Sequence, residues 1–397
     1  MSHFDNDYDY NNEYNEYDDE QICRLNLLEV AKLCDSDTLD LADPKYNLIG
    51  KCIKFVCYSV QTKNNTIKRI INIDKLNFQL CRQFEYMFCN FTALETIDGL
   101  DKLDVSKIYD MHNMFENCCN LQSLNISTWD VSNVENMTDM FMYCESLQLL
   151  NLTKWNTLNV KHISGMFCDC RSLTSLDLNN FNTSNVKDIS YMFSKCKSLT
   201  TLNISNWDVS NVRCINGTFH RCETLQQIDL SNWNTQNIKF TIYMFNDCKS
   251  LTSLNLSNWN VSNLINAQRM FNNCISLTSL NISNWNISKL INLVYMFSNC
   301  ESLVELDLST WNISNGHDMS HMFENCKSLM SIHLGNWNTI NTIIIDDIFK
   351  NCKSLSLVDL SKCRHIKYTI SNELFKYKNI TFICPDSHKH DKCKNNN

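Results

Sequence analysis

Glycine and proline are scarce in this chain, with six glycines and two prolines among 397 residues. The closest glycines, Gly316 and Gly335, are 19 positions apart. The motifs GxGxxG, GxxxxGK and GxSxG are therefore all absent, since each needs two glycines within a few residues. This absence excludes the dinucleotide-binding, P-loop and nucleophile-elbow classes of enzyme.

Long hydrophobic runs and a basic N-terminal segment are also absent. No stretch approaches the roughly 18 apolar residues of a membrane span. Residues 1–20 contain eight acids and no Lys or Arg, which is unlike a secretory signal. We therefore expect a soluble, intracellular protein with reduced thiols and no membrane insertion. The remaining residues hold 35 acids and 35 bases, so a neutral body gives no reason to expect a nucleic-acid partner.

A 26-residue period dominates the sequence. Ten phenylalanines follow it from Phe115 to Phe349, and a cysteine comes three residues after each one. All eight tryptophans share the period, and Phe181 stands where one tryptophan is missing. We expect these in-phase side chains to build the core as a ladder that includes Trp129, Trp155, Trp207, Trp233, Trp259, Trp285, Trp311, Trp337, Phe141, Phe193, Phe245, Phe297, Cys144, Cys196, Cys248 and Cys300.

One unit, residues 251–274, shows how each repeat folds. Its first half, LTSLNLSNWNV, fits the leucine-rich repeat pattern with Trp259 in the usual place of Asn or Cys. The alternation of apolar and polar residues predicts a short strand, and the second half predicts a helical, 3₁₀ or irregular return. A unit this short cannot bury its apolar face alone. We therefore predict a repeat solenoid, a right-handed leucine-rich-repeat-like coil with a parallel β-sheet on one face and short returns on the other.

The recurring segments SLTSLNISNW, WDVSNV and MF-x-x-C carry a family resemblance. They resemble the 26-residue repeat of BspA-type leucine-rich repeat surface proteins, known from bacteria, protists and large viruses, over about residues 81–384. The resemblance implies a solenoid used for adhesion or protein binding. Because the chain shows no signal peptide, lipid-anchor or sorting motif, we do not extend surface display to it. Few Gly and Pro beside many Asn, Lys and Ile are typical of an AT-rich genome, which favours a protist or giant virus as the source.

Composition divides the chain into four segments. Residues 1–20 form an acidic tail that we expect to be disordered. We interpret residues 21–80 as an N-terminal cap or, alternatively, a small adaptor module, with a helix over about 20–35 and strands at 52–60 and 66–73. The solenoid then spans residues 81–384 in about 11–12 repeats, and residues 385–397 form a polar tail.

The candidate binding surface is the concave side, which the polar residues beside the strand leucines would face. Its uniform Asn, Asp, Ser and Thr content could serve a protein or glycan partner, or be only a solvated sheet. A second candidate is an aromatic stripe of Tyr191, Tyr243 and Tyr295 on the return side, which could instead pack repeat on repeat. The concave binding candidates are Asn125, Asp177, Asn203, Asp229, Asn255, Asn281 and Asp307.

The sequence carries weaker signals for metal binding and catalysis than for the repeat fold. Cys384, His388, His390 and Cys393 could offer a metal four ligands, but their spacing matches neither common zinc pattern, which favours a solvated tail. We expect the cysteine ladder to consist of free core thiols and the protein to need no cofactor. No motif places a nucleophile beside a base, so we expect a non-enzymatic interaction scaffold. The alternatives are an intracellular adaptor that uses residues 21–80, or a structural spacer or particle component.

Overall fold

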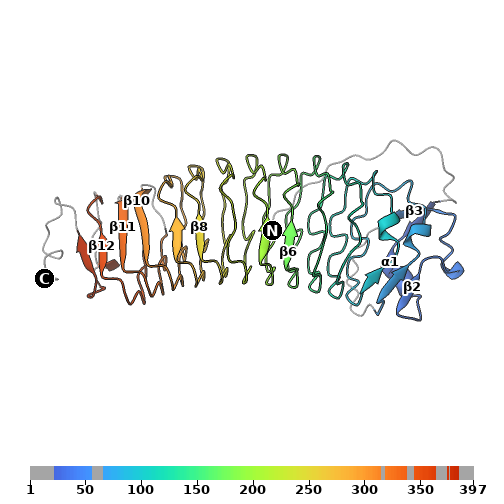
Figure 1. The fold of residues 1–397 in the computed structure, drawn as a ribbon, viewed down its shortest axis with the longest axis horizontal. Coiled ribbons are helices and arrows are strands. Elements are labelled where there is room, and N and C mark those ends of the chain that lie inside the picture. The colour runs from blue at the N-terminus through green and yellow to red at the C-terminus, as the bar shows by residue number, and fades with distance from the viewer. Residues whose placement is uncertain are drawn as a thin grey trace.

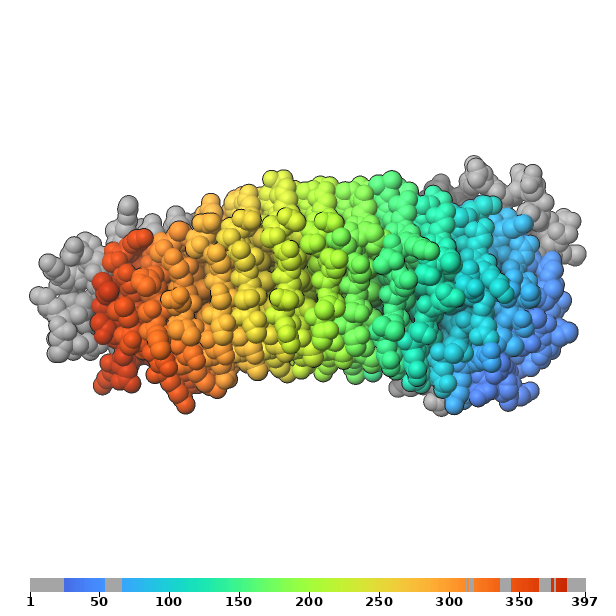
Figure 2. Space-filling view, in the orientation of Figure 1, coloured from blue at the N-terminus to red at the C-terminus, as the bar shows by residue number. Residues whose placement is uncertain are grey.

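The 26-residue units wind into successive turns of one elongated solenoid (Figure 1). This computed structural model describes residues 22–55, 66–313, 318–337, 344–363, 373–374 and 376–383. Each turn, here called a rung, lies beside the next along the long axis, so that colours follow one another as neighbouring bands (Figure 2). The predicted leucine-rich-repeat-like parallel coil is confirmed.

Short parallel strands form one side of the coil, here called the strand face. Partners lie one repeat apart, as Leu254 with Leu280. In the strands at residues 175–177, 253–255 and 279–281 the middle residue is buried while its two neighbours are exposed. The sheet is divided into groups of two to four strands. The groups are β6 (Ser175–Asp177) with β7 (Thr201–Asn203), β8 (Ser253–Asn255) with β9 (Ser279–Asn281), and β10 (Glu305–Ile313), β11 (Ser331–Trp337), β12 (Leu357–Asp359) and β13 (Thr381–Ile383).

The N-terminal segment adds its own parallel strands to the stack. Its two groups are β1 paired with β3, and β2, β4 and β5 in that order. The sheet of β4 thus continues into β5 of the first rung. In chain order the elements are β1 (Ile22–Leu25), α1 (Leu27–Ala31), β2 (Thr38–Asp40), the 3₁₀ helix η2 (Pro44–Tyr46), β3 (Cys52–Phe55), β4 (Arg69–Ile71), η3 (Ile73–Lys75), β5 (Thr96–Ile97) and η4 (Leu100–Lys102).

The prediction of a helix over residues 20–35 is mostly wrong. Only Leu27–Ala31 is α-helical, and Ile22–Leu25 is a strand instead. Two interactions explain the difference. Parallel pairing with β3 holds the first four residues extended, and the side chain of Asn26 starts the helix by accepting hydrogen bonds from the amides of Leu28 and Glu29.

The side opposite the strands, here called the return face, consists of consecutive turns rather than helices between residues 105 and 313. Two residues of each return have positive φ, as Asn113 and Asn117 do at 55° and 61°, and a helix needs an unbroken run of negative φ. Successive backbone amides of the return then alternate between a carbonyl acceptor in their own rung and one in the next rung. Met114 donates to Met111 in its own rung, whereas Phe115 donates to Met140 in the next. The sequence predicted a helical, 3₁₀ or irregular return, and the structure shows the irregular form.

Two aromatic stacks run through the interior. One contains the in-phase phenylalanines, whose ring centroids lie 5.2 Å apart at Phe88–Phe115 and 5.9 Å apart at Phe193–Phe219. The other contains the tryptophans, with 6.4 Å between Trp285 and Trp311. Nearly parallel, offset rings at these spacings attract one another beyond the area they bury. Trp129, Trp155, Trp207, Trp233, Trp259, Trp285 and Trp311 are all buried, while the side chain of Trp337 lies outside the described part.

Side-chain donors connect each rung to the carbonyl groups of the previous one. The indole of Trp285 donates to the Leu256 carbonyl at 3.0 Å, and that carbonyl also accepts the amide of Trp259. The thiol of Cys144 similarly donates to the Phe115 carbonyl at 3.2 Å, which also accepts the amide of Cys118. Both donors therefore satisfy the second lone pair of a buried carbonyl, which would otherwise lack a partner.

We predict that Trp285→Phe destabilises the protein more than Trp311→Phe. Both changes remove the same ring volume, but among the described residues the Trp311 indole has no hydrogen-bond partner, whereas that of Trp285 has one. The difference should be about 1 kcal/mol, the net contribution of one hydrogen bond. Phe181 shows that this stack accepts phenylalanine.

Urea unfolding followed by far-ultraviolet circular dichroism measures the two free energies of unfolding. Equal losses in the two variants would contradict a stabilising role for the indole hydrogen bond.

Candidate functional site

The seven predicted concave residues are all exposed on the strand face. Most of them also form turns. Asp229 accepts a hydrogen bond from the backbone amide two residues later, at Ser231, and Asp307 accepts one from Ser309. These bonds hold the pKa of both carboxyls below the ordinary value. Asp177, Asn255 and Asn281 form the same turn.

A groove of about 690 Å³ crosses the strand face in the N-terminal half of the solenoid. Four leucines from adjacent rungs lie along it, and three of these are only half-buried. Leu149 is also there, 64 % exposed, at a position that holds Ser or Thr in the flanking rungs. Serine, threonine, Asn and Asp side chains complete the lining. The lining residues are Ser123, Leu124, Leu149, Leu150, Asn151, Thr153, Ser175, Leu176, Asp177, Thr201, Leu202 and Asn203.

A second groove of about 740 Å³ lies on the strand face towards the C-terminal end. It is more charged than the first, because Glu305 and Asp307 meet His333 and Lys362 there. The two grooves include four of the predicted concave residues, namely Asp177 and Asn203 in the first and Asn281 and Asp307 in the second. Asn125, Asp229 and Asn255 line neither.

The three predicted stripe tyrosines lie in one positive-φ row of the return face. Tyr243 accepts a hydrogen bond from Arg269 at 2.9 Å, and the Arg269 guanidinium lies 4.7 Å from the centre of the Tyr295 ring. Tyr295 in turn stacks on His321 at 4.5 Å. Tyr191 is separated from this group by Gly217, where its ring occupies the space of a Cβ. The tyrosines thus pack rung on rung, and 45 % of Tyr191 stays exposed.

The ladder cysteines lie in the core as free thiols, buried except for half-buried Cys352. Burial raises the pKa of Cys300 to about 12, and their sulfur atoms donate to carbonyl oxygens at 2.9 to 3.2 Å. These thiols are therefore poor nucleophiles. The candidate metal ligands Cys384, His388, His390 and Cys393 lie outside the described residues.

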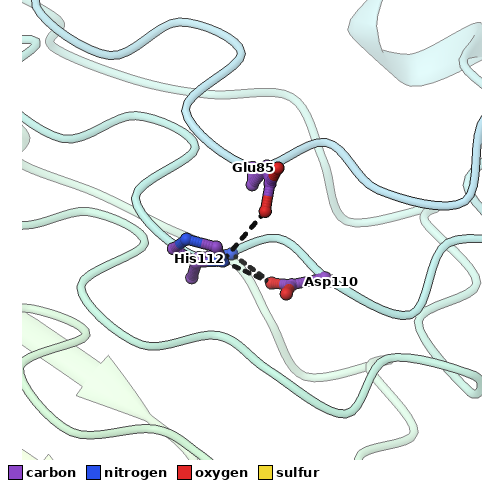
Figure 3. A group of neighbouring side chains, drawn as sticks. All are labelled: Glu85, Asp110 and His112. Atoms are coloured by element: carbon purple, nitrogen blue, oxygen red, sulfur yellow. Dashed lines mark hydrogen bonds and ion pairs between the residues drawn. The ribbon is translucent and has the colours of Figure 1, made fainter. Parts of the chain in front are cut away.

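Glu85, Asp110 and His112 converge at the N-terminal end of the return face (Figure 3). The Nδ1 atom of His112 lies 2.7 Å from Asp110 Oδ1 and 3.7 Å from Glu85 Oε2. The His112 backbone amide also donates to Asp110 Oδ1, which fixes the local turn. All three side chains are half-buried, and both carboxylates point toward the imidazole.

Further negative charge surrounds this cluster. Burial and the neighbouring carboxylate of Glu116 raise the pKa of Asp139 to about 6, against the opposing charge of His112. Burial also raises the pKa of Glu85. For His112, burial acts to lower the pKa, but the hydrogen bond and charge of Asp110 raise it above its ordinary value.

Sequence reasoning did not find the cluster. Glu85 and His112 occupy the same row on adjacent rungs, but the spacing there is 27 residues rather than 26, as it is between Phe88 and Phe115. Other rungs carry Thr138, Ser164 and Ser190 at this position. A comparison of rungs row by row, with the one-residue insertion allowed, would have shown Glu85 and His112 in a row that elsewhere holds hydroxyl, amide and apolar side chains and one further acid, Asp346.

The repeats match a known protein family. The profile of the family described as "Mycoplasma protein of unknown function, DUF285" matches residues 82–201, 169–280 and 252–363, which together are more than half of the chain. The chain belongs to this family. Members of the DUF285 family have no function in that description, so membership defines the repeat and assigns no activity. No curated protein matches the chain.

Solved structures with similar coils include bacterial leucine-rich repeat proteins. One from Bacteroides ovatus is 17 % identical, with a TM-score of 0.47, and the match covers 95 % of this chain and 100 % of that one. A leucine-rich cell surface protein from Faecalibacterium prausnitzii is 16 % identical, with a TM-score of 0.39 and coverage of 86 % and 90 %. At these values the matches assign no function. Among the described residues, no helix is long and apolar enough to cross a membrane.

We predict that alkylation of the native protein modifies Cys34 and spares the buried ladder cysteines, Cys118 to Cys326. Partial burial acts to raise the pKa of Cys34, but hydrogen bonds with Ser36 bring it below the ordinary value, whereas the ladder thiols other than Cys352 are buried, and burial raises the pKa of Cys300 to about 12. After denaturation all 22 cysteines should react. Mass spectrometry of the alkylated protein gives both counts, and a denatured count well below 22 would indicate disulfides.

We also predict that Asp139→Asn stabilises the protein at about pH 8 but not at about pH 4. Because the folded-state pKa of Asp139 is raised, the native protein holds this proton more tightly than the unfolded chain, and stability falls as pH rises through about 4 to 6. Asparagine suits the positive φ of this position, as Asn113 shows.

The urea midpoints of wild type and variant, compared across this pH range, test the prediction. A difference between them that does not change with pH would contradict it.

Proposed function

We propose that this protein is a non-enzymatic interaction scaffold that binds a protein partner across several rungs of its strand face. The observation that carries the proposal is the groove around Leu149, where half-buried leucines are bordered by hydroxyl and carboxylate groups. An apolar centre with a polar rim is the usual composition of a protein interface. Most other rungs offer polar side chains at the position of Leu149, with Ser123 and Ser175 on either side, and Leu357 near the C-terminal end is the exception.

The polar ladder suits a supporting role in this interface. Asp177 and Asp307 each use one oxygen atom to form their own turn, which fixes the direction of the carboxylate and leaves its other oxygen for a partner. Preorganised polar groups reduce the entropy lost on binding. The contacts of the seven predicted residues would then add specificity to the apolar contribution of the groove.

For the N-terminal segment, we propose the role of a cap rather than an adaptor. Three observations support this. Strand β4 pairs with β5 of the first rung, the buried residues Ile70 and Ile73 belong to the same core as the repeats, and the thiol of Cys81 donates to the carbonyl of Ile53. Solenoids need such covered ends. The kinship with BspA-type proteins stays a prediction.

The experiment compares Leu149→Arg with Ile291→Arg. Leu149 lies in the groove, whereas Ile291, 53 % exposed, belongs to the row that also contains Arg213 and Lys239 and so accepts a basic residue. A partner captured from source cells on the immobilised wild-type protein is identified, purified and titrated against each variant. Leu149→Arg should weaken binding by about tenfold or more, because burial of a leucine contributes about 1.5–3 kcal/mol.

Ile291→Arg should leave the affinity unchanged. Equal affinities of the partner for wild type and Leu149→Arg would exclude this groove as the binding site, and equal losses in both variants would indicate a general defect in folding.

A further inference from the structure

The turns of the repeat do not need the combination of Glu85, Asp110 and His112, because other rungs form the same turn without it. The turn at Asp110 recurs at Asn136 and at Asp318, where it closes on the amides of Thr138 and Ser320 without any imidazole. The turn therefore needs an oxygen acceptor at this position, but it does not need a histidine two residues later. Nor does it need an acid in the same row of the previous rung.

Charge balance distinguishes this cluster from several other buried or half-buried acids. Cations from the same or a neighbouring rung accompany those acids, as Arg171 and Lys195 do for Asp169, and Lys197 and Lys249 for Glu223. Among the described residues, no Lys or Arg forms an ion pair with any of the four carboxylates around His112. These are Glu85, Asp110, Glu116 and Asp139.

The donor atoms also have suitable separations for one metal ion. Donors that share a divalent ion at about 2.1 Å lie roughly 3 to 3.5 Å from one another. The Nδ1 atom of His112 lies 2.7 Å and 3.7 Å from the carboxylate oxygens of Asp110 and Glu85, and all three donors lie within 4.8 Å. Small side-chain rotations suffice to bring such distances into this range, and half-burial leaves the group open to solvent.

We propose that Glu85, Asp110 and His112 form a binding site for a divalent transition-metal ion that bridges the first two rungs of the return face. The imidazole and two carboxylates are ligands that suit Mn²⁺ and Zn²⁺. Binding at Nδ1 requires the neutral ring with its proton on Nε2, so a protonated His112 must first release its Nδ1 proton to solvent. Three protein ligands leave the remaining coordination positions to water.

Manganese is the appropriate probe, because thiolates compete for zinc and this chain has 22 cysteines. Full-length, reduced, chelator-treated protein is titrated with Mn²⁺ at slightly alkaline pH, and free Mn²⁺ is measured by electron paramagnetic resonance. The wild type should bind a single equivalent. Asp110→Asn and His112→Ser should each weaken binding by at least about tenfold.

Both variants use residues that the repeat itself accepts, since Asn136 and Ser190 occupy the matching positions. The matched control is Asp318→Asn, which changes the same turn in a rung that carries Ser320 at the position of His112 and should leave Mn²⁺ affinity unchanged. Glu85→Gln provides an independent test on the adjacent rung if either first variant unfolds. Mn²⁺ should also raise the thermal midpoint of wild type but not of Asp110→Asn, because a ligand that binds only the folded state stabilises it.

Unchanged Mn²⁺ affinity in the folded Asp110→Asn, His112→Ser or Glu85→Gln variants would overturn the proposal, because the ion would then lie elsewhere. So would a wild-type protein that binds no Mn²⁺ at millimolar concentration. A loss of affinity in Asp318→Asn equal to that in Asp110→Asn would show that the effect is not specific to this cluster, and would overturn it as well.

Discussion

The structure depends on hydrogen bonds from core side chains of one rung to backbone carbonyls of the rung before it. Trp155 and Cys144 represent the two donors, which reach the carbonyls of Ile126 and Phe115. A turn that closes on its own rung leaves a buried carbonyl with a free lone pair, and burial without a partner is costly. Indole N–H and thiol S–H groups supply that partner while their apolar surfaces fill the core. One residue thus provides both packing and register.

This constraint explains why the repeat length hardly varies. A shift of one residue would move the donor away from its carbonyl and break the phenylalanine and tryptophan stacks at once. It also explains how the corners form with so few glycines. Asn and Asp side chains close turns on nearby amides, as Asp229 does, and asparagines such as Asn325 and Asn351 occupy the positive-φ positions and bond to one another.

The candidate functional positions are those where a rung departs from the common pattern. Leu149 replaces a hydroxyl residue on the strand face and exposes apolar surface beside half-buried leucines. Glu85 and His112 stand in a return-face row where the next rungs carry Thr138, Ser164 and Ser190, and no lysine or arginine among the described residues forms an ion pair with Glu85 or Asp110. The two departures lie on different faces, so partner binding and metal binding are separable properties.

The sequence by itself determined the parallel coil, its period and the identity of the core columns, because each column repeats a residue type whose burial a single rung cannot achieve. It also located the turn-forming Asn and Asp residues of the strand face. Only the tertiary structure decided that the returns are not helical, since the positive φ of Asn117 or Lys195 leaves no trace in hydrophobic spacing. The convergence of Glu85 with His112 likewise depends on stacking, which places residues of different rungs side by side.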